Sequence, residues 1–261
     1  MKKYIENFMK YKHLLAELVK KTIKLKYRRS YLGIFWTLLE PLLNMLVLTF
    51  VFGTLFNRSE KDPYFAVYIL SGRLLYSFFA GSTRSAMRSI RVHSSMIKKV
   101  YIPKYIYPLA AAISEFVFFL ISLIVLGGVA IVLRVPLSVY ILQLIVPVFF
   151  LFILSIGVGL ILATLAVFFR DLEYLWSIAL TIIMYGSAIF YYPDNFINSG
   201  KDWIFNLNPL YAAIVNFRNG IYYNRPLQAS SMIYLMVVSI LCLVVGVVVL
   251  KKNQDKFILH L

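Results

Sequence analysis

The sequence predicts an all-α integral membrane protein with six transmembrane helices, an N-terminal amphipathic interfacial helix and short re-entrant outer helices before the last span. Hydrophobic residues make up 61% of the 261 residues, more than one soluble core of this length can bury. They gather in runs about as long as the roughly 20 helical residues that cross a hydrocarbon core. Most of the 27 Lys and Arg residues lie between these runs, which is typical of membrane proteins.

Residues 1–30 predict the amphipathic helix, lying on the cytoplasmic side of the membrane. Lysines occupy much of its surface, and an apolar stripe recurs every three or four residues at Tyr4, Ile5, Phe8, Tyr11, Leu15, Leu18, Val19 and Ile23. Such a helix lies along the leaflet and is attracted by anionic lipid. The alternative is that these charges only fix the topology.

Residues 31–261 predict one transmembrane domain. Its spans are expected near 32–56, 64–83, 105–133, 139–168, 172–192 and 229–250. Pro41 should kink the first span and leave a backbone carbonyl open to another donor, because proline has no N–H. The segment 84–104 is too polar to insert, whereas 193–228 is apolar enough to fold back as short re-entrant helices.

The distribution of positive charge predicts the orientation. Residues 1–31, 84–104, 170 and the tail after 250 hold 20 of the 27 Lys and Arg residues. Because cytoplasmic loops retain basic residues, both termini are expected in the cytoplasm and 193–228 outside. The chain is therefore expected to be a multi-pass protein of the cytoplasmic membrane. Since topology explains the basic clusters, no nucleic-acid partner is expected.

No pattern in the sequence predicts catalysis. The G-x-x-x-x-G-K-[ST] loop that binds ATP phosphates is absent, and no pair of carboxylates shares a helical face. His13, His93 and His260 are isolated, so no metal site is expected. Cys242 is the single cysteine, which excludes an intramolecular disulfide. We predict no catalytic, cofactor-binding or metal-binding residue, and no enzyme activity in this chain alone.

Four segments, in this order, resemble the ABC-type polysaccharide and polyol-phosphate export permeases. They are "YRRSYLGIFWTLLEPLLNMLVLTFVFG" (27–53), "MIKKVYIPKYIYPLA" (96–110), "FFRDLEYLW" (168–176) and "LNPLYAAIVNFRNGIYY" (207–223). Proteins of this family export O-antigen, capsule precursors or wall teichoic acid. The resemblance implies a homodimer joined to two ATP-binding cassette subunits, which bind ATP and Mg²⁺, and a lipid-linked glycan as substrate. An ABC permease for a small lipid or drug is the alternative, and a membrane-bound glycan-modifying enzyme is a third.

An ATPase on a separate subunit must contact the cytoplasmic surface, where 84–104 is the largest internal segment. The resemblance implies a short coupling helix there, with ATPase contacts at Arg88, Arg91, Ile97, Lys98 and Lys99. The alternative is a positively charged loop without a partner. "FRDLEY" (169–174) predicts a second contact, through Arg170 and Asp171. It is equally well read as a turn that starts the next helix.

Three charged residues fall inside the predicted spans, where each is costly unless paired or hydrated. Counted from the expected cytoplasmic ends, Glu40, Arg73 and Glu115 lie at about the same depth. We expect a charge network of these three residues, with Arg73–Glu115 as the preferred pair and Glu40 as the second choice. A structural clamp explains it better than a substrate site.

A long glycan needs a continuous channel, and the axis of a homodimer can provide one. The resemblance implies that the first and fifth spans line it, with aromatic rings at Tyr31, Phe35, Trp36, Tyr185, Phe190, Tyr191 and Tyr192. Arg28 and Arg29 would admit the phosphate or pyrophosphate of a lipid carrier. The alternative for the aromatic residues is an ordinary belt at the membrane interface.

Overall fold

The computed structural model describes residues 2–28, 30–54, 62–99, 102–136, 138–193 and 203–257, and within these ranges it contains helices and no strand. The long helices are α1 (Lys2–Lys26), α2 (Trp36–Thr49), α3 (Phe65–Val92), α5 (Ile106–Val132), α6 (Ile145–Phe168), α7 (Leu172–Tyr185) and α11 (Ala229–Asn253). Shorter helices are α4 (Ser94–Ile97), α9 (Trp203–Asn206) and α10 (Pro209–Ile221). The predicted all-α membrane fold is confirmed.

Among the described residues, five helical stretches are long and apolar enough to cross a membrane: Gly33–Gly53, Phe65–Val92, Ile106–Val132, Val139–Phe168 and Ala229–Lys256. The span predicted at 172–192 is not among them, because α7 ends at Tyr185 and the chain then turns, with a positive φ of 48° at Ala188. A sixth span therefore stays a prediction. At ~1.5 Å per residue α7 is about 21 Å long, which is less than a hydrocarbon core of roughly 30 Å.

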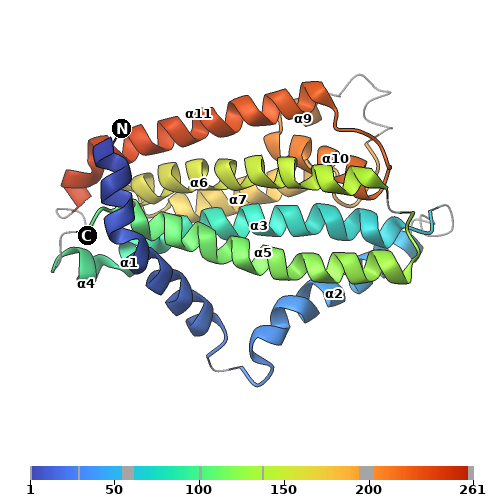
Figure 1. Ribbon diagram of the computed structural model, residues 1–261, viewed down its shortest axis with the longest axis horizontal. Coiled ribbons are helices and arrows are strands. Elements are labelled where there is room, and N and C mark those ends of the chain that lie inside the picture. Colours follow the sequence, from blue (N-terminus) through green and yellow to red (C-terminus); the bar gives the residue numbers. More distant parts are fainter. Residues whose placement is uncertain are drawn as a thin grey trace.

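The helix α3 forms the centre of the bundle, between α5 and α6 (Figure 1). It is buried along most of its length, since its small and aromatic residues face neighbours on several sides. The α6–α11 contact depends on glycine. A Cβ at Gly157 would lie 2.5 Å from the backbone nitrogen of Leu243, and one at Gly246 would lie 2.6 Å from the Gly157 carbonyl oxygen. Glycines of this kind let membrane helices approach closely.

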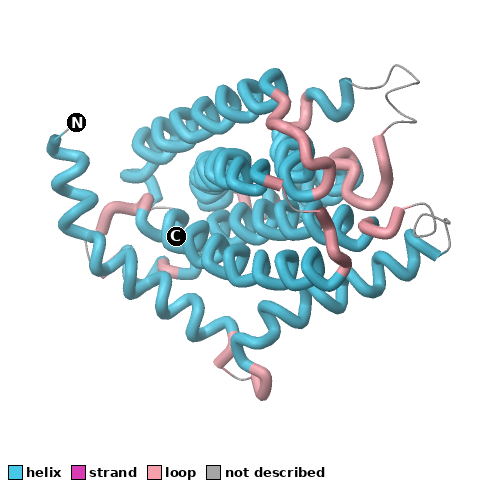
Figure 2. Tube along the Cα trace, turned by 45° about the vertical axis from the view of Figure 1, so that its right-hand side comes forward, coloured by secondary structure: helices cyan, strands magenta, loops and turns pink. Residues whose placement is uncertain are grey.

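The helices α1 and α2 form a V beside the bundle, with the short loop between them at its tip (Figures 1 and 2). The predicted interfacial helix packs on protein as well as facing outward. Leu18 of α1 is only 5% exposed and belongs to a cluster with Ile90, Ile97 and Ile106. By contrast, several large side chains of α2 are exposed, among them Leu43, Leu46 and Val47.

The segment predicted as a cytoplasmic loop, 84–104, is largely helical. The helix α3 continues to Val92, α4 follows, and α5 begins at Ile106. About 20 residues span the hydrocarbon core, so counting from Phe65 at the opposite end of α3 puts the membrane boundary near Arg84. The adjoining ends of α3 and α5 therefore extend beyond the core, because a helix does not need to stop where the lipid does.

The predicted outer segment, 193–228, contains α9 and α10 among its described residues. The side chain of Asn208 caps α10 by accepting from the backbone N–H of Leu210, at 3.0 Å. The helix α10 packs against α3, α6, α11 and the turn Val139–Leu144. A re-entrant course through the membrane remains a prediction.

Candidate functional site

A polar cavity of about 330 Å³ lies where the α1–α2 hinge meets α3 and α5. Its charged lining residues are Lys26, Glu40, Arg73, Arg84 and Glu115. The structure thus brings Glu40, Arg73 and Glu115 to one cavity, as the sequence indicated, and adds two cations that sequence reasoning did not include.

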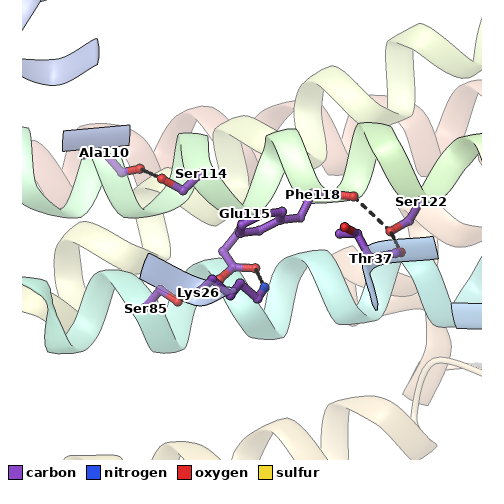
Figure 3. Close-up of polar contacts among 8 residues, drawn as sticks. All are labelled: Lys26, Thr37, Ser85, Ala110, Ser114, Glu115, Phe118 and Ser122. Atoms are coloured by element: carbon purple, nitrogen blue, oxygen red, sulfur yellow. Dashed lines mark hydrogen bonds and ion pairs between the residues drawn. The ribbon is translucent and has the colours of Figure 1, made fainter. Parts of the chain in front are cut away.

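The preferred pair Arg73–Glu115 is not the one that forms. Lys26 Nζ lies 3.5 Å from Glu115 Oε2, and the Ser85 hydroxyl donates to Glu115 Oε1 at 3.1 Å (Figure 3). Lys26 also lies 3.9 Å from the centre of the Phe118 ring. These contacts fasten the end of α1 to α5.

The error in pairing came from the end chosen for α3. The predicted depth of Arg73 assumes that its helix ends near residue 83, but α3 continues to Val92, beside the start of α5. Measured from the true helix ends, Arg73 lies roughly 15 Å further along the bundle than Glu115. Arg73 instead donates to the Met184 sulfur at 3.4 Å and lies 5.5 Å from the Tyr76 ring centre.

Pro41 frees a backbone carbonyl, as predicted. Proline at position 41 cannot donate to the Thr37 carbonyl one turn earlier. The Ser122 hydroxyl of α5 fills this gap, lying 3.2 Å from the Thr37 oxygen and 2.9 Å from the Phe118 oxygen of its own helix (Figure 3). The start of α2 is thereby held against α5.

The residues predicted for ATPase coupling occupy two different environments. Ile97 is 6% exposed and packs in the cluster with Leu18 and Ile90, so it does not offer a surface contact. The exposed residues of the set are Arg88, Lys98, Lys99, Arg170 and Asp171.

The two arginines of the set contact another helix of the same chain. Arg88 Nε lies 2.9 Å from Glu173 Oε2, and Arg91 forms an ion pair with the other oxygen of Glu173. Sequence reasoning missed Glu173. The available signal was an acid in the first turn of α7, where the helix dipole favours negative charge.

The predicted channel residues also divide into two groups. Tyr31 is fully exposed and Phe35, Trp36 and Tyr185 are well exposed, as is Arg28. Arg29 lies outside the described residues.

The remaining aromatic residues make contacts within the chain. The burial of Phe190 corrects its placement in a channel lining, whereas Tyr191 and Tyr192 are partly exposed and their place in a channel stays a prediction. Phe190 is buried and stacks on Phe52, with ring centres 5.2 Å apart. The Tyr191 hydroxyl donates to the Tyr185 carbonyl at 2.6 Å. The hydroxyl of Tyr192 donates to the Asp62 carboxylate.

Tyr222 donates to the same Asp62 oxygen as Tyr192, which closes a cluster before the start of α3. Burial, followed by the hydrogen bond to Asp62, raises the pKa of both tyrosines above the ordinary value. They therefore remain protonated donors at physiological pH.

Arg218 of α10 is a second residue that sequence reasoning missed. It is 2% exposed, and its guanidinium donates to the carbonyls of Ala188 and Tyr68, each at 2.9 Å. The central carbon of its guanidinium group, Cζ, lies 3.4 Å from the Tyr68 ring centre. Backbone carbonyls and an aromatic face thus stabilise this cation, and they join α10 to α3 and to the turn after α7.

Comparison with known proteins shows which family this chain resembles in sequence. The ABC-2 type transporter family matches residues 13–222. The O-antigen export system permease protein RfbA of Klebsiella pneumoniae is 27% identical over 245 residues, covering 94% of this chain and 93% of that protein. The protein of the same name from Myxococcus xanthus is 26% identical over 98% of both chains. The polysialic acid transport protein KpsM of Escherichia coli is 23% identical, covering 89% of this chain and 90% of its own. The chain belongs to the ABC-2 type transporter family.

Proposed function

We propose that this chain is the transmembrane permease subunit of an ABC transporter that exports a lipid-linked polysaccharide across the cytoplasmic membrane. The observation that carries the proposal is the similarity to O-antigen export permeases over 94% of this chain and 93% of the Klebsiella protein. ATP and Mg²⁺ are assigned to a separate ATP-binding cassette subunit. The names of the relatives, which refer to O-antigen, polysialic acid and capsule polysaccharide, favour a polymer over a small lipid or drug.

The basic ends of the bundle suit contact with that ATPase. Lys98 and Lys99 are exposed just after α4, and Arg170 and Asp171 are exposed before α7. The ion pairs of Arg88 and Arg91 with Glu173 tie α3 to α7. Force applied to this surface would therefore move both helices together. Ile97 packs inside the cluster with Leu18 and Ile90. Ile97→Asp is therefore expected to unfold this end of the bundle rather than to uncouple ATP hydrolysis from export.

The exposed aromatic residues suit a glycan path formed with a second copy of the chain. Tyr31, Phe35 and Trp36 lie just before or at the start of α2, near the exposed Arg28. An arginine can bind a carrier phosphate with two parallel hydrogen bonds, and flat rings stack on sugars. Tyr185 at the end of α7 would continue the path. Both termini are assigned to the cytoplasm.

The proposal is tested by deleting the gene in its host while leaving the neighbouring genes intact. We expect the surface polysaccharide to disappear and its lipid-linked precursor to accumulate inside, as detected by immunoblotting and by mass spectrometry of extracted lipids. A plasmid copy should restore export, and an inactive ATPase partner should reproduce the defect. Normal surface polysaccharide in the deletion strain would contradict the proposal and favour a small-molecule substrate.

A further inference from the structure

A second cavity, of about 430 Å³, lies between α1, the last turns of α3, α4 and the first turns of α5. Part of its lining, here called the floor, is apolar and includes Leu18 and Met96. Its basic lining residues are Lys21 of α1, Arg88 of α3 and His93, the residue that joins α3 to α4. No acidic residue is among the described residues that line it. The cavity therefore combines a positive rim with an apolar floor.

One lining residue has a hydroxyl group without a partner. Tyr107 is 1% exposed, and its hydroxyl makes no hydrogen bond within the described part of the chain. Its ring stacks on His93 at 4.9 Å between centres, while His93 Nδ1 lies 2.8 Å from the Ser89 carbonyl oxygen. A buried hydroxyl without a partner is costly, so such a group indicates a missing hydrogen-bonding partner.

Two of the three acids close to this cavity are paired with cations that do not line it, and the third, Glu173, engages the Nε of the lining residue Arg88. Glu17, one turn before Lys21, lies 2.9 Å from Lys20. Glu115 is paired with Lys26, and Glu173 with Arg88 Nε and with Arg91. Among the described residues, neither Lys21 nor His93 forms a salt bridge. The rim thus keeps a net positive charge.

The inner part of the cavity, at Ser85 and Arg88, lies at the depth of the lipid headgroups. The hydrocarbon boundary on α3 falls near Arg84, about 20 residues from Phe65. At ~1.5 Å per residue, Ser85 and Arg88 lie about 1.5 and 6 Å beyond that boundary, and Val92 lies about 12 Å beyond it. Headgroups add roughly 5–8 Å on each side of a core of roughly 30 Å.

We propose that this cavity binds the phosphate-bearing headgroup of an anionic membrane lipid. Lys21, Arg88 and the Tyr107 hydroxyl donate to the phosphate, because charged donors and a buried hydroxyl suit its oxygens. The apolar floor covers the carbon skeleton next to the phosphate, which a free phosphate ion does not have. Since α1 and α4 both line the cavity, the bound lipid would hold these two helices together. The proposal concerns lipid binding by the chain itself and does not depend on the exported polymer.

The test measures lipid retained by the purified full-length chain, using native mass spectrometry in detergent. The probes are phosphatidylglycerol and undecaprenyl phosphate, with phosphatidylcholine as the neutral comparison and sodium phosphate as a competitor. We expect one anionic lipid per chain, and Lys21→Glu should weaken its binding roughly tenfold. The matched control is Lys12→Glu, an exposed lysine nine residues earlier on the opposite side of α1, which should change binding less than about twofold.

A second variant separates binding from folding. Tyr107→Phe removes only the unpartnered hydroxyl, so thermal stability without anionic lipid should not fall, whereas lipid binding should weaken about fivefold. Preference for phosphatidylglycerol would identify a bilayer lipid, and preference for undecaprenyl phosphate a polyprenyl carrier; both support the site. Equal effects of Lys21→Glu and Lys12→Glu, full competition by sodium phosphate, or no lipid retained would overturn it. None of these outcomes depends on export, so they are independent of the gene-deletion test.

Discussion

At the scale of single residues, the hydroxyl of Ser122 in α5 replaces a backbone hydrogen bond that a proline removes from α2. Pro41 leaves the Thr37 carbonyl without its helical donor, and Ser122 supplies the replacement from α5. The sequence predicted the free carbonyl, because proline always creates one. It did not predict the donor, because many serines and threonines occur in the spans and only packing brings one of them within reach.

Ser122→Ala is expected to destabilise the fold by about 1 kcal/mol, because the buried Thr37 carbonyl would lose its partner across the helix interface. For a chain of this size that corresponds to roughly 2–4 °C in Tm, measured by thermal unfolding in detergent. Ser114→Ala is the matched control. Ser114 is also buried on α5, but among the described residues its hydroxyl donates only to the Ala110 carbonyl of its own helix, at 2.8 Å (Figure 3). Equal shifts for the two variants would show that the bond to Thr37 contributes nothing.

At the scale of elements, two glycines determine how closely α6 and α11 pack. A Cβ at Gly157 would lie within 3 Å of the α11 backbone, at 2.5 Å from Leu243 N and 2.6 Å from Cys242 C. Backbone atoms cannot move aside as the end of a side chain can. The two helices would have to separate along their contact.

We therefore expect Gly157→Ala to lower the stability by about 1–3 kcal/mol, the usual cost of overpacking. Gly128→Ala in α5 is the control, because no neighbouring atom of the described residues lies within 4 Å of the place that a Cβ would take there. That change should be neutral or slightly stabilising, since alanine favours helix by up to ~1 kcal/mol over glycine. Thermal unfolding and the yield of monodisperse protein measure both variants. A stable Gly157→Ala protein would contradict the close contact of α6 and α11.

The sequence predicted the helices better than their ends. Hydrophobic runs marked five spans that the structure contains, because lipid requires an apolar helix of a definite length. The prediction from sequence failed where the end of a helix does not coincide with the edge of the membrane. The helix α3 continues past the core to Val92, and α7 stops at Tyr185 although the apolar run goes on to Tyr192. These two errors account for the wrong partner of Glu115 and for the misplacement of Phe190. Cross-helix partners such as Glu173 depend on packing, which a single sequence does not encode in its periodicity.

At the scale of the whole molecule, the first open question is which end of the bundle faces the cytoplasm. The basic residues near the ends of α3 and α5 favour the end that carries α4. In a Cys242→Ser background, Pro226→Cys should react with a membrane-impermeant maleimide on intact cells. Ser95→Cys should react only after the cells are permeabilised. Both positions are exposed, so burial does not separate them. The reverse labelling pattern would invert the topology.

The second question is which face meets another copy of the chain, and a carboxylate on α2 provides the argument. Glu40 is exposed in the single chain, roughly 10 Å along the span that begins at Gly33. A carboxylate facing lipid at that depth costs several kcal/mol, so the polar cavity that Glu40 lines on this face of α2 is expected to open toward protein or water and not toward lipid. The exposed face of α11 carries aliphatic residues such as Val244 and Val248 and suits lipid. In the Cys242→Ser background, Val47→Cys on α2 should therefore form disulfide-linked dimers in native membranes under mild oxidation. Val244→Cys on α11 should not, although it is similarly exposed. Cross-linking through α11 alone would place the dimer axis on the opposite side of the bundle, and the glycan path with it.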